Sequence, residues 1–444
     1  MNDSLNGKKI AVIGLGVSNI SVISYLLKHD LKQLTIFDTR LNPPYTGDLP
    51  VGVDLRLGSL DAAVLEKYDM VVISPGISIY QEEITKIIKA GVEVVGDIEL
   101  FARVAKAPVI GITGSNGKST VTSLMGFMTD VAKMKVAIGA NIGIPVFNIL
   151  SDDVQLYVLE LSSFELETTK SLKLAAGTIL NVSEDHLDRY HGSMLEYADA
   201  KKRIYAHCKN AVVNREDKLT YPDSAEGFDS FVSFGSDNSE YGLEKDSETT
   251  YLTVNKERVL DVRELRIYGA HNYLNALACM ALADAVGISR ESQIYALRHF
   301  VGLQHRCQLV KKLKDVSYYN DSKATNVASA EAAIDGLKDL HKEKIILLAG
   351  GLGKGQDFSP LKKYLGKEVC AVFCFGKDKQ KLLELSDKYC FDVETMEEGL
   401  NKAYQMATTG QAVLLSPACA SFDQFKGFEH RGQVFVDLVS KLGE

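Results

Sequence analysis

The chain has 444 residues, which is enough for about three domains of roughly 150 residues each. Its hydrophobic and charged contents, 46% and 24%, exclude a disordered chain, and its net charge of −8 argues against a nucleic acid as partner. No apolar run reaches the length of a membrane span and the N-terminus lacks the apolar stretch of a signal peptide, so we expect no membrane partner. The seven cysteines are odd in number and form no CxxC, which fits reduced thiols in a cytoplasmic protein.

The first 96 residues alternate short apolar runs with stretches of helical length. Buried strands are predicted at residues 9–14, 34–38 and 70–76, and helices at residues 17–28 and 81–90. This order predicts a parallel sheet of Rossmann-like α/β architecture. We therefore place the first domain at residues 1–96.

Two loops at the carboxyl ends of these strands contain glycine. The sequence GLGVSN at 14–19 resembles the dinucleotide motif G-x-G-x-x-G, with Asn19 in place of the third glycine, and Asp38 ends the next strand near the usual offset of about 20 residues. The second loop is SPGI at 74–77. Both loops would open at the ligand-binding edge of the sheet, so we favour a nucleotide or diphosphate headgroup there. A nicotinamide dinucleotide, or tight turns without a ligand, are the alternatives.

VIGITGSNGKSTVT, residues 109–122, is the most informative segment of the chain. An apolar strand meets a glycine loop and then a helix, an arrangement whose N–H groups and helix dipole favour phosphate. Lys118 adds a positive charge, and Ser119 adds a hydroxyl that can bind Mg²⁺. A standard P-loop has glycine at the position that Ile112 occupies here. The segment therefore predicts a nucleoside triphosphate site of an uncommon kind.

Further central segments carry groups that suit a metal or a phosphate. Glu160 ends an apolar strand, and a strand-end acid beside a P-loop is where Mg²⁺ is held, although a solvated strand end would look the same in isolation. His186 lies among three acids in residues 183–188 and is either a metal ligand or a structural histidine. The basic residues 201–203 fit a solvated helix face equally well, and Asn141 fits a turn.

The rest of the chain predicts an insertion and a third domain. Residues 218–267 are more polar, with short alternating runs, and predict a small β insertion in a central domain of residues 97–301. A helix over 272–286 places Asn272 and Asn275 about one turn apart, where their amides could bind a base or cap the helix. The third domain, residues 302–444, again alternates strands and helices. Its candidate anion-binding segments are HRC from His305, DSKATN from Asp321, GGLGK from Gly350 and SPACASFDQF from Ser416.

Nine segments, in this order, resemble the Mur ligase family of ATP-dependent amide ligases. They are ITGSNGKST, GANIG, LELSSFELE, NVSEDHLDRY, AKKRIY, HNYLNALA, HRCQ, DSKATN and SPACASFDQFKGFEHRG. The family's own loop, T-G-x-N-G-K-[ST], is matched by residues 113–119, which accounts for the missing glycine. The resemblance implies an α/β fold with a Rossmann-like N-terminal domain for a UDP-linked substrate, a central P-loop ATPase domain with a parallel sheet, and a Rossmann-like C-terminal domain for D-glutamate and part of ATP.

Within the family, DSKATN and SPACASFDQF resemble the branch that joins D-glutamate to UDP-N-acetylmuramoyl-L-alanine in cytoplasmic peptidoglycan precursor synthesis. The implied reaction consumes ATP, uses two Mg²⁺ ions and passes through an acyl phosphate. By the same resemblance the catalytic residues are Lys118, Glu160, His186 and Lys201, and the metal ligands are Ser119, Glu160, His186 and a carbamylated Lys201. The pattern A-K-x-R-I-Y selects Lys201 over its neighbour Lys202.

The resemblance also implies three sets of binding residues. The ATP set is Gly114, Ser115, Asn116, Gly117, Lys118, Ser119, Thr120, Asn272, Asn275, Arg306 and Asp321. The set for the UDP-linked substrate is Gly14, Gly16, Val17, Ser18, Asp38, Thr39, Arg40, Gly76, Asn141 and His186. The D-glutamate set is Lys323, Thr325, Lys354, Ser421 and Phe428.

Three other functions deserve comparison. A sister ligase such as folylpolyglutamate synthetase would keep ATP and glutamate but lose the UDP domain, which the two N-terminal loops argue against. A Rossmann oxidoreductase would leave residues 113–119 unexplained. A nucleotide-binding regulator would not need the set of lysines and acids. We expect a monomeric enzyme that acts on small molecules.

Overall fold

The computed structural model describes residues 5–338, 340–342 and 344–443. The chain forms two compact units. One comprises the residues up to Glu264 together with Leu274–Arg298, and the other comprises Leu265–Tyr273 together with the residues from His299 onward. Leu265–Tyr273 thus groups with the C-terminal part of the chain. The three-domain boundaries at residues 96 and 301 remain predictions.

The N-terminal part of the first unit is a five-stranded parallel sheet. In sheet order its strands are β3 (Asp54–Leu57), β2 (Gln33–Asp38), β1 (Lys9–Ile13), β4 (Met70–Ile73) and β5 (Glu93–Val95). Helix α1 (Val17–Leu26) covers one face, and α2 (Ala62–Leu65) and α3 (Glu82–Lys89) cover the other. Strand β1 is apolar from Ile10 onward because its alternate residues join the cores on opposite faces.

The central part of the same unit is a nine-stranded sheet. In sheet order the strands are β14 (Glu257–Asp261), β13 (Thr250–Val254), β12 (Tyr241–Lys245), β11 (Ser230–Phe234), β10 (Cys208–Asn214), β9 (Leu174–Ile179), β6 (Val109–Thr113), β8 (Leu156–Glu160) and β7 (Val136–Ala140). Strand β11 pairs in parallel with β10 and with β12, whereas β13 is antiparallel to both of its neighbours, β12 and β14. The β-rich stretch expected within 218–267 is therefore an extension of the central sheet itself.

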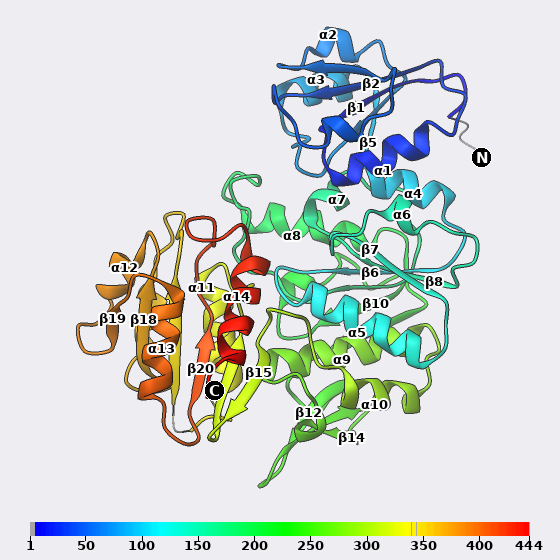
Figure 1. The fold of residues 1–444 in the computed structure, drawn as a ribbon. Helices are drawn as coiled ribbons and strands as arrows, with labels where there is room; N and C mark the ends of the chain where they lie inside the picture. The colour runs from blue at the N-terminus through cyan, green and yellow to red at the C-terminus, as the bar shows by residue number, and fades with distance from the viewer. Residues whose placement is uncertain (1–4, 339, 343, 444) are drawn as a thin grey trace. The chain divides into compact units, whose positions relative to one another are not determined.

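Helices cover both faces of the central sheet (Figure 1). One face carries α4 (Asp97–Val104), α6 (Val146–Ile149), α7 (Ser163–Glu167) and α8 (Met194–Lys202). The long helices α5 (Lys118–Val131) and α9 (Ala270–Ala285) lie side by side, and Cys279 Sγ of α9 is 3.9 Å from the Val121 carbonyl oxygen of α5. Helix α10 (Arg290–His299) follows α9.

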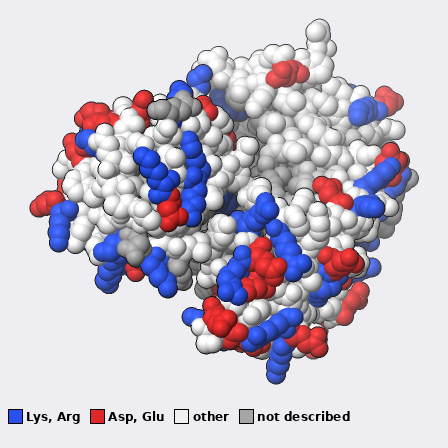
Figure 2. Space-filling view, turned by 60° about the horizontal axis from the view of Figure 1, so that its bottom comes forward, with Lys and Arg blue, Asp and Glu red and all other residues white. Residues whose placement is uncertain are grey.

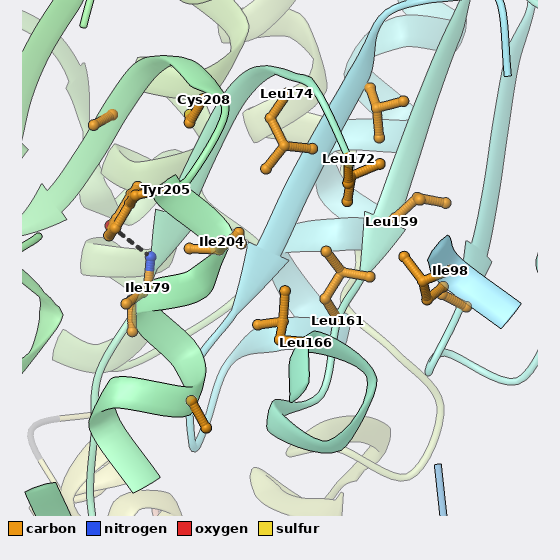
Figure 3. Packing of buried hydrophobic residues seen from close by; sticks show 14 of the residues in the cluster. Ile98, Leu159, Leu161, Leu166, Leu172, Leu174, Ile179, Ile204, Tyr205 and Cys208 are labelled. Carbon is orange, nitrogen blue, oxygen red and sulfur yellow. Dashed lines mark hydrogen bonds between the residues drawn. The ribbon is translucent and has the colours of Figure 1, made fainter. Parts of the chain in front are cut away.

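Figure 3 shows the apolar core between this sheet and the helices on its first face. Leu159 and Leu174 extend from strands, and Ile204 and Tyr205 follow helix α8. The Tyr205 hydroxyl accepts a hydrogen bond of 3.2 Å from the Ile179 N–H. A Cβ at Gly111 would lie only 2.7 Å from Leu174 Cδ1, so this glycine of β6 allows the close packing of the Leu174 side chain.

The second unit contains a six-stranded sheet. In sheet order its strands are β15 (Gln308–Leu313), β16 (Val316–Asn320), β20 (Ala412–Leu415), β17 (Ile345–Gly350), β18 (Val369–Phe375) and β19 (Cys390–Asp392), and only β15 is antiparallel to its neighbour. Helices α11 (Val327–Leu337) and α12 (Lys379–Leu383) pack on one face, and α13 (Met396–Met406) and α14 (Phe428–Ser440) pack on the other. Because β16, β20 and β17 are adjacent and parallel, the three candidate anion loops that follow them share one edge.

Within the described residues, no helix is both long and apolar enough to cross a membrane. On the face shown in Figure 2, acidic and basic side chains are interspersed. Exposed charges often pair, as Arg258 does with Glu244 and Arg298 with Glu264. This face carries no field of a single sign of the kind that holds a nucleic acid backbone.

Replacing Gly350 by alanine should destabilise the second unit. Its φ of +137° excludes most side chains, and a Cβ there would collide with the Phe375 carbonyl oxygen. We expect a loss of about 3 kcal/mol in the free energy of unfolding. The measurement is the urea midpoint by circular dichroism, since the chain has no tryptophan. Gly355→Ala is the control, because its φ of +81° costs about 1 kcal/mol and its Cβ would meet no atom within 4 Å. Equal losses in both variants would contradict the argument.

Candidate active site

The loop between β6 and α5 is shaped as an anion cradle. Gly114 has a φ of +148°, and Gly117, which caps α5, has a φ of +86°. Glycine adopts both conformations without the strain that a side chain would introduce. The first N–H groups of the 14-residue helix α5 therefore face the loop, where the helix dipole favours a phosphate.

The segment after β9 braces this loop. The Ser115 N–H donates to the Asn181 carbonyl at 2.9 Å, and the Asn116 N–H donates to Asn181 Oδ1 at 2.8 Å. The Ser115 hydroxyl donates to the Ser183 carbonyl at 3.0 Å and accepts from the Ser183 N–H at 2.9 Å. The loop conformation is thus held by hydrogen bonds from a separate strand end.

Two lysines meet at one backbone oxygen of the loop. Lys118 Nζ donates to the Gly114 carbonyl at 2.7 Å and to the Ser115 carbonyl at 3.1 Å. Lys201 Nζ donates to the same Gly114 carbonyl at 3.2 Å and lies 4.4 Å from the centre of the Tyr197 ring. Burial, and then the charge of Lys118, hold the pKa of Lys201 well below its usual range. Lys201 is therefore inclined to be a neutral amine.

The adjacent lysine points elsewhere. Lys202 Nζ forms ion pairs with Asp199 at 3.3 Å and with Asp223 at 3.1 Å. Lys201 is 1% exposed and lies beside the phosphate loop, whereas Lys202 forms ion pairs with acids of greater exposure. The structure thereby distinguishes Lys201 from Lys202, which the sequence distinguished only by a match to a family motif.

Glu160 brings a buried carboxylate to the same edge of the sheet. Strand pairing sets Glu160 opposite Ile112, directly before the phosphate loop. Its Oε1 accepts a hydrogen bond of 2.6 Å from Asn141 Nδ2, whereas Oε2 is buried without a hydrogen-bond partner among the described residues. A buried carboxylate oxygen with no donor is costly, and a cation would satisfy it. Glu160 therefore fits a Mg²⁺ ligand.

The described residues contain no group of three or more histidines, cysteines or acids that could hold a metal by themselves. Mg²⁺ commonly takes one or two carboxylates and completes its shell with phosphate oxygens, hydroxyls and water. Ser119 is half-buried in the first turn of α5 and could supply such a hydroxyl.

His186 occupies an open loop. Its backbone is left-handed, with a φ of +52°, and its side chain is 51% exposed. The ring packs edge-on against Phe164 at 4.9 Å and lies 3.5 Å from Asp185 Oδ2. In the part of the chain that the structure describes, no hydrogen bond or ion pair joins it to the other predicted metal ligands.

The two N-terminal glycine loops lie against each other. A Cβ at Gly14 would be 3.0 Å from Ser74 Cβ, and the Ser74 N–H donates to the Ile13 carbonyl at 2.9 Å. Asn19 Nδ2 donates to the carbonyls of Ile13 and Gly14 at 3.0 and 2.8 Å. Asn19 thus replaces the third glycine of the motif with a side chain that fixes the first turn.

Asp38 is occupied by contacts within the chain. Its carboxylate accepts the Leu15 N–H at 2.7 Å, the Arg40 N–H at 2.8 Å and two bonds from the Arg40 guanidinium at 2.9 and 2.6 Å. The Arg40 hydrogen bond is the main reason that the pKa of Asp38 falls to about 2. Because its oxygens are engaged, Asp38 is poorly placed to bind a ribose hydroxyl, which argues against a nicotinamide dinucleotide.

The other predicted residues of this region differ in exposure. Val17, Thr39, Gly76 and Asn141 are exposed, and Gly16 and Ser18 are half-buried.

Two predicted glutamate-binding residues are in contact in the second unit. Lys323 Nζ lies 3.8 Å from the centre of the Phe428 ring, and the Ser322 hydroxyl donates to the Phe428 carbonyl at 2.8 Å. A bridge between Leu352 and Ala420 joins the other two loops of the edge. Among the remaining predicted residues, Lys354 is exposed, Thr325 half-buried and Ser421 buried.

Asp321 is buried in the second unit. It accepts the Cys307 N–H at 3.0 Å and the Ser416 hydroxyl at 2.7 Å, and burial raises its pKa to about 7. Arg306 interacts with it electrostatically. Asn272 also belongs to this unit, whereas Asn275 belongs to the first and lies so close to the phosphate loop that a Cβ at Gly117 would be 2.6 Å from its Oδ1. The boundary between the two compact units therefore falls between Asn272 and Asn275.

Comparison with known proteins accounts for nearly the whole chain. Residues 8–96 match the family model "Mur ligase MurD-like, N-terminal domain", residues 112–283 match "Mur ligase middle domain" and residues 305–419 match "Mur ligase, glutamate ligase domain". The chain belongs to the Mur ligase family. Its three parts are therefore the three domains of a Mur ligase, as the nine sequence segments predicted.

Relatives within the family are similar over their full length. The UDP-N-acetylmuramoylalanine–D-glutamate ligases of Escherichia coli strain K12 and Yersinia pseudotuberculosis are each 47% identical to this chain and cover 98% of it, with 99% of the relative aligned.

Solved Mur ligase structures share the fold. The UDP-N-acetylmuramate–alanine ligase of Thermotoga maritima has a TM-score of 0.61 at 20% identity and covers 98% of this chain and 99% of its own. The MurF ligase of the same organism, solved in complex with ADP, has a TM-score of 0.61 at 16% identity, with 99% and 97% covered.

The sequence motifs of this Mur ligase did not identify the residues that hold the phosphate loop in place. Asn181 and Ser183 stand in the segment NVSEDH, which pointed only to His186. Glu165 forms a capping box with Ser162 at the start of α7, a pattern visible in the sequence as S-x-x-E. That Glu165 is buried near Asp97 could not be read from the sequence, because the two belong to different helices.

Glu165 should make stability fall as pH rises. Burial, and then the charge of Asp97, raise the pKa of Glu165 to about 8, and the charge of Glu160 adds to this. The folded chain thus keeps a proton that the unfolded chain releases above its ordinary pKa of 4.5, so the free energy of unfolding decreases between these values. Glu165→Gln, which imitates the protonated acid, should flatten this decline in urea titrations from pH 5 to 8.

Glu184→Gln provides the control, because Glu184 is exposed. Its urea midpoints should follow the unmodified chain at every pH. If Glu165→Gln does the same, Glu165 is ionised in the folded protein and the argument is wrong.

Proposed function

We propose that this chain is an ATP-dependent ligase that adds D-glutamate to UDP-N-acetylmuramoyl-L-alanine and releases ADP and phosphate. The observation that carries the proposal is 47% identity over 98% of the chain to ligases named for this reaction. The braced phosphate loop with Lys118 and the buried Glu160 support it independently.

The chemistry requires activation of a carboxylate. The substrate carboxylate attacks the γ-phosphorus of ATP, giving an acyl phosphate and ADP. The glutamate amine then attacks the acyl carbon, and the tetrahedral intermediate expels phosphate. Several anions gather during these steps, so positive groups and N–H donors must offset their charge. Lys118 and the N-terminus of α5 supply both at one place.

Mg²⁺ would be held by Ser119, Glu160, His186 and a carbamylated Lys201, with two ions in the site. When bound, the metal neutralises phosphate charge and orients the reacting oxygens. The uncompensated oxygen of Glu160 supports the place of Glu160 in this set.

Lys201 is suited to carbamylation. A neutral amine attacks the carbon of CO₂, and the nitrogen loses one proton to solvent, which leaves a carbamate anion. Burial beside Lys118 disfavours the charged amine and thus prepares this step. The product places a negative charge next to the phosphate loop, where a metal ion can bind it.

The remaining binding sets are part of the proposal. Asn272, Asn275, Arg306 and Asp321 would contact ATP, and Lys323, Thr325, Lys354, Ser421 and Phe428 would surround D-glutamate. The loops at Gly14 and Gly76 and the residues Thr39 and Arg40 would hold the UDP-linked substrate, and Asp38 would act by orienting Arg40. The enzyme would act as a monomer in the cytoplasm, which its seven free cysteines suit.

Lys118→Ala should abolish phosphate release. We expect phosphate release from ATP to depend on both UDP-N-acetylmuramoyl-L-alanine and D-glutamate, and the variant to lose about a thousandfold in rate because a phosphate-neutralising charge is gone. Lys202→Ala is the matched control, since its ion pairs lie with Asp199 and Asp223. A Lys118→Ala enzyme with the unmodified rate would refute the central assignment.

Lys201 should carry a ¹³C label. Protein equilibrated with ¹³C-bicarbonate at pH 7 should show a carbamate resonance in the ¹³C NMR spectrum, because a lysine of lowered pKa supplies more of the neutral amine than an ordinary lysine does. Lys201→Arg should lack the resonance and the activity, whereas Lys202→Arg should keep both. An unchanged spectrum in Lys201→Arg would rule out this lysine.

A further inference from the structure

Arg189 connects two segments that the proposed function assigns to the UDP-linked substrate. It lies in the loop between β9 and α8, within the first compact unit. Its Nη1 donates to the Pro75 carbonyl at 2.9 Å, and its Nη2 donates to the Ile77 carbonyl at 3.2 Å. These carbonyls flank Gly76 in the loop that follows β4.

The orientation of the guanidinium is fixed from its other side. Glu167 Oε1 accepts from Nε at 3.2 Å and Oε2 accepts from Nη2 at 2.5 Å, so the carboxylate binds the planar fork through two oxygens. Tyr190 Oη donates to Glu167 Oε1 at 2.6 Å, and the guanidinium lies 4.1 Å from the centre of the Phe164 ring. Arg189 and Glu167 are 8% and 1% exposed, so little water competes with these bonds.

The bond to Pro75 also sets the direction of the next amide. A trans peptide is planar, and its C=O and N–H point in opposite directions. By holding the Pro75 carbonyl, Arg189 directs the Gly76 N–H away from itself. The contact therefore controls a main-chain donor in a loop that lies against the first glycine loop at Gly14.

Arg189 is also linked to His186. The Arg189 N–H donates to the His186 carbonyl at 3.0 Å, and the Phe164 ring that lies under the guanidinium packs edge-on against the His186 ring at 4.9 Å. A second contact joins the two loops at the surface, where the rings of Tyr80 and His191 are 5.7 Å apart. One buried ion pair thus fixes the Gly76 loop and the His186 loop together.

We infer that Arg189 is a positioning residue for the UDP-linked substrate, holding the Gly76 and His186 segments at the separation that this substrate requires. The inference rests on the proposed function. Only arginine can serve two carbonyls and a carboxylate from one planar group, so lysine at this position keeps the charge but loses the geometry. The expected consequence is a defect in binding one substrate, with ATP and D-glutamate unaffected.

Steady-state kinetics of Arg189→Lys tests the inference. We expect its KM for UDP-N-acetylmuramoyl-L-alanine to rise by about tenfold, because two charge-assisted bonds to the loop are lost, while KM for ATP and D-glutamate stays within about twofold. Glu167→Gln, which keeps the side-chain shape but removes the ion pair, should shift the same constant in the same direction. Titration calorimetry with UDP-N-acetylmuramoyl-L-alanine alone should show the matching loss of affinity.

Arg103→Lys is the matched control. Arg103 also bridges carboxylates, Glu99 at 3.0 Å and Glu93 at 2.6 Å, and Glu99 in turn accepts the N–H groups of Lys170 and Ser171. These partners lie outside the two substrate segments, so the three KM values of Arg103→Lys should match those of the unmodified enzyme. The midpoints of thermal unfolding of Arg189→Lys and Arg103→Lys should be equal. A KM defect in Arg189→Lys alone then reflects lost positioning and not lost stability.

Two results would overturn the inference. One is a KM for the UDP-linked substrate in Arg189→Lys within twofold of the unmodified enzyme. The other is an equal rise in all three KM values, or the same rise in Arg103→Lys, which would indicate a general loss of structure. If Arg189→Lys does not fold, Glu167→Gln decides by the same criteria. An unmodified enzyme without glutamate-dependent phosphate release would instead refute the proposed function.

Discussion

The backbone carbonyl of Gly114 accepts hydrogen bonds from two lysine side chains, and the candidate site is organised around this oxygen. Lys118 reaches it from the first turn of α5 and Lys201 from the end of α8, so two lysine Nζ atoms share one acceptor. Two positive charges at such a point are costly, and the pKa of the more buried lysine falls. The same contact that shapes the phosphate loop thus prepares Lys201 for chemistry that an ordinary surface lysine could not perform.

Strand order brings the other charged group to this point. Strands β6 and β8 are neighbours and in register, so the acid that ends β8 lies beside the residue before the phosphate loop. Hydrogen bonds that Ser115 and Asn116 donate to Asn181, and that Ser115 exchanges with Ser183, then fix the loop conformation. A buried carboxylate oxygen and the N-terminus of α5 remain for a metal and a phosphate, which is the arrangement that phosphoryl transfer to a carboxylate needs.

In the N-terminal part of the chain, charged side chains shape the loops. Asp38 and Asn19 form hydrogen bonds with the main chain of the turn at Gly14, and Arg189 donates hydrogen bonds to the carbonyls beside Gly76. Asp38, which the dinucleotide motif assigns to a ligand, here fixes main-chain conformation instead. Main-chain N–H groups of fixed direction then become available to a substrate, and glycine allows the close approach.

The sequence by itself determined the fold class, the family and the position of the phosphate loop. Apolar runs of strand length and a contiguous motif such as TGSNGKS carry that information locally, because each depends on neighbours along the chain. The tertiary structure alone decided that Gly111 serves packing, that Lys201 is buried while Lys202 is not, and that Asp38 is saturated. It alone placed Glu165 near Asp97 and Arg189 on the Gly76 loop. Glu165 and Asp97, and likewise Arg189 and Gly76, are 68 or more positions apart in the sequence, so no local pattern predicts their proximity. Burial sets the energies of these groups, and it exists only once the strands have paired.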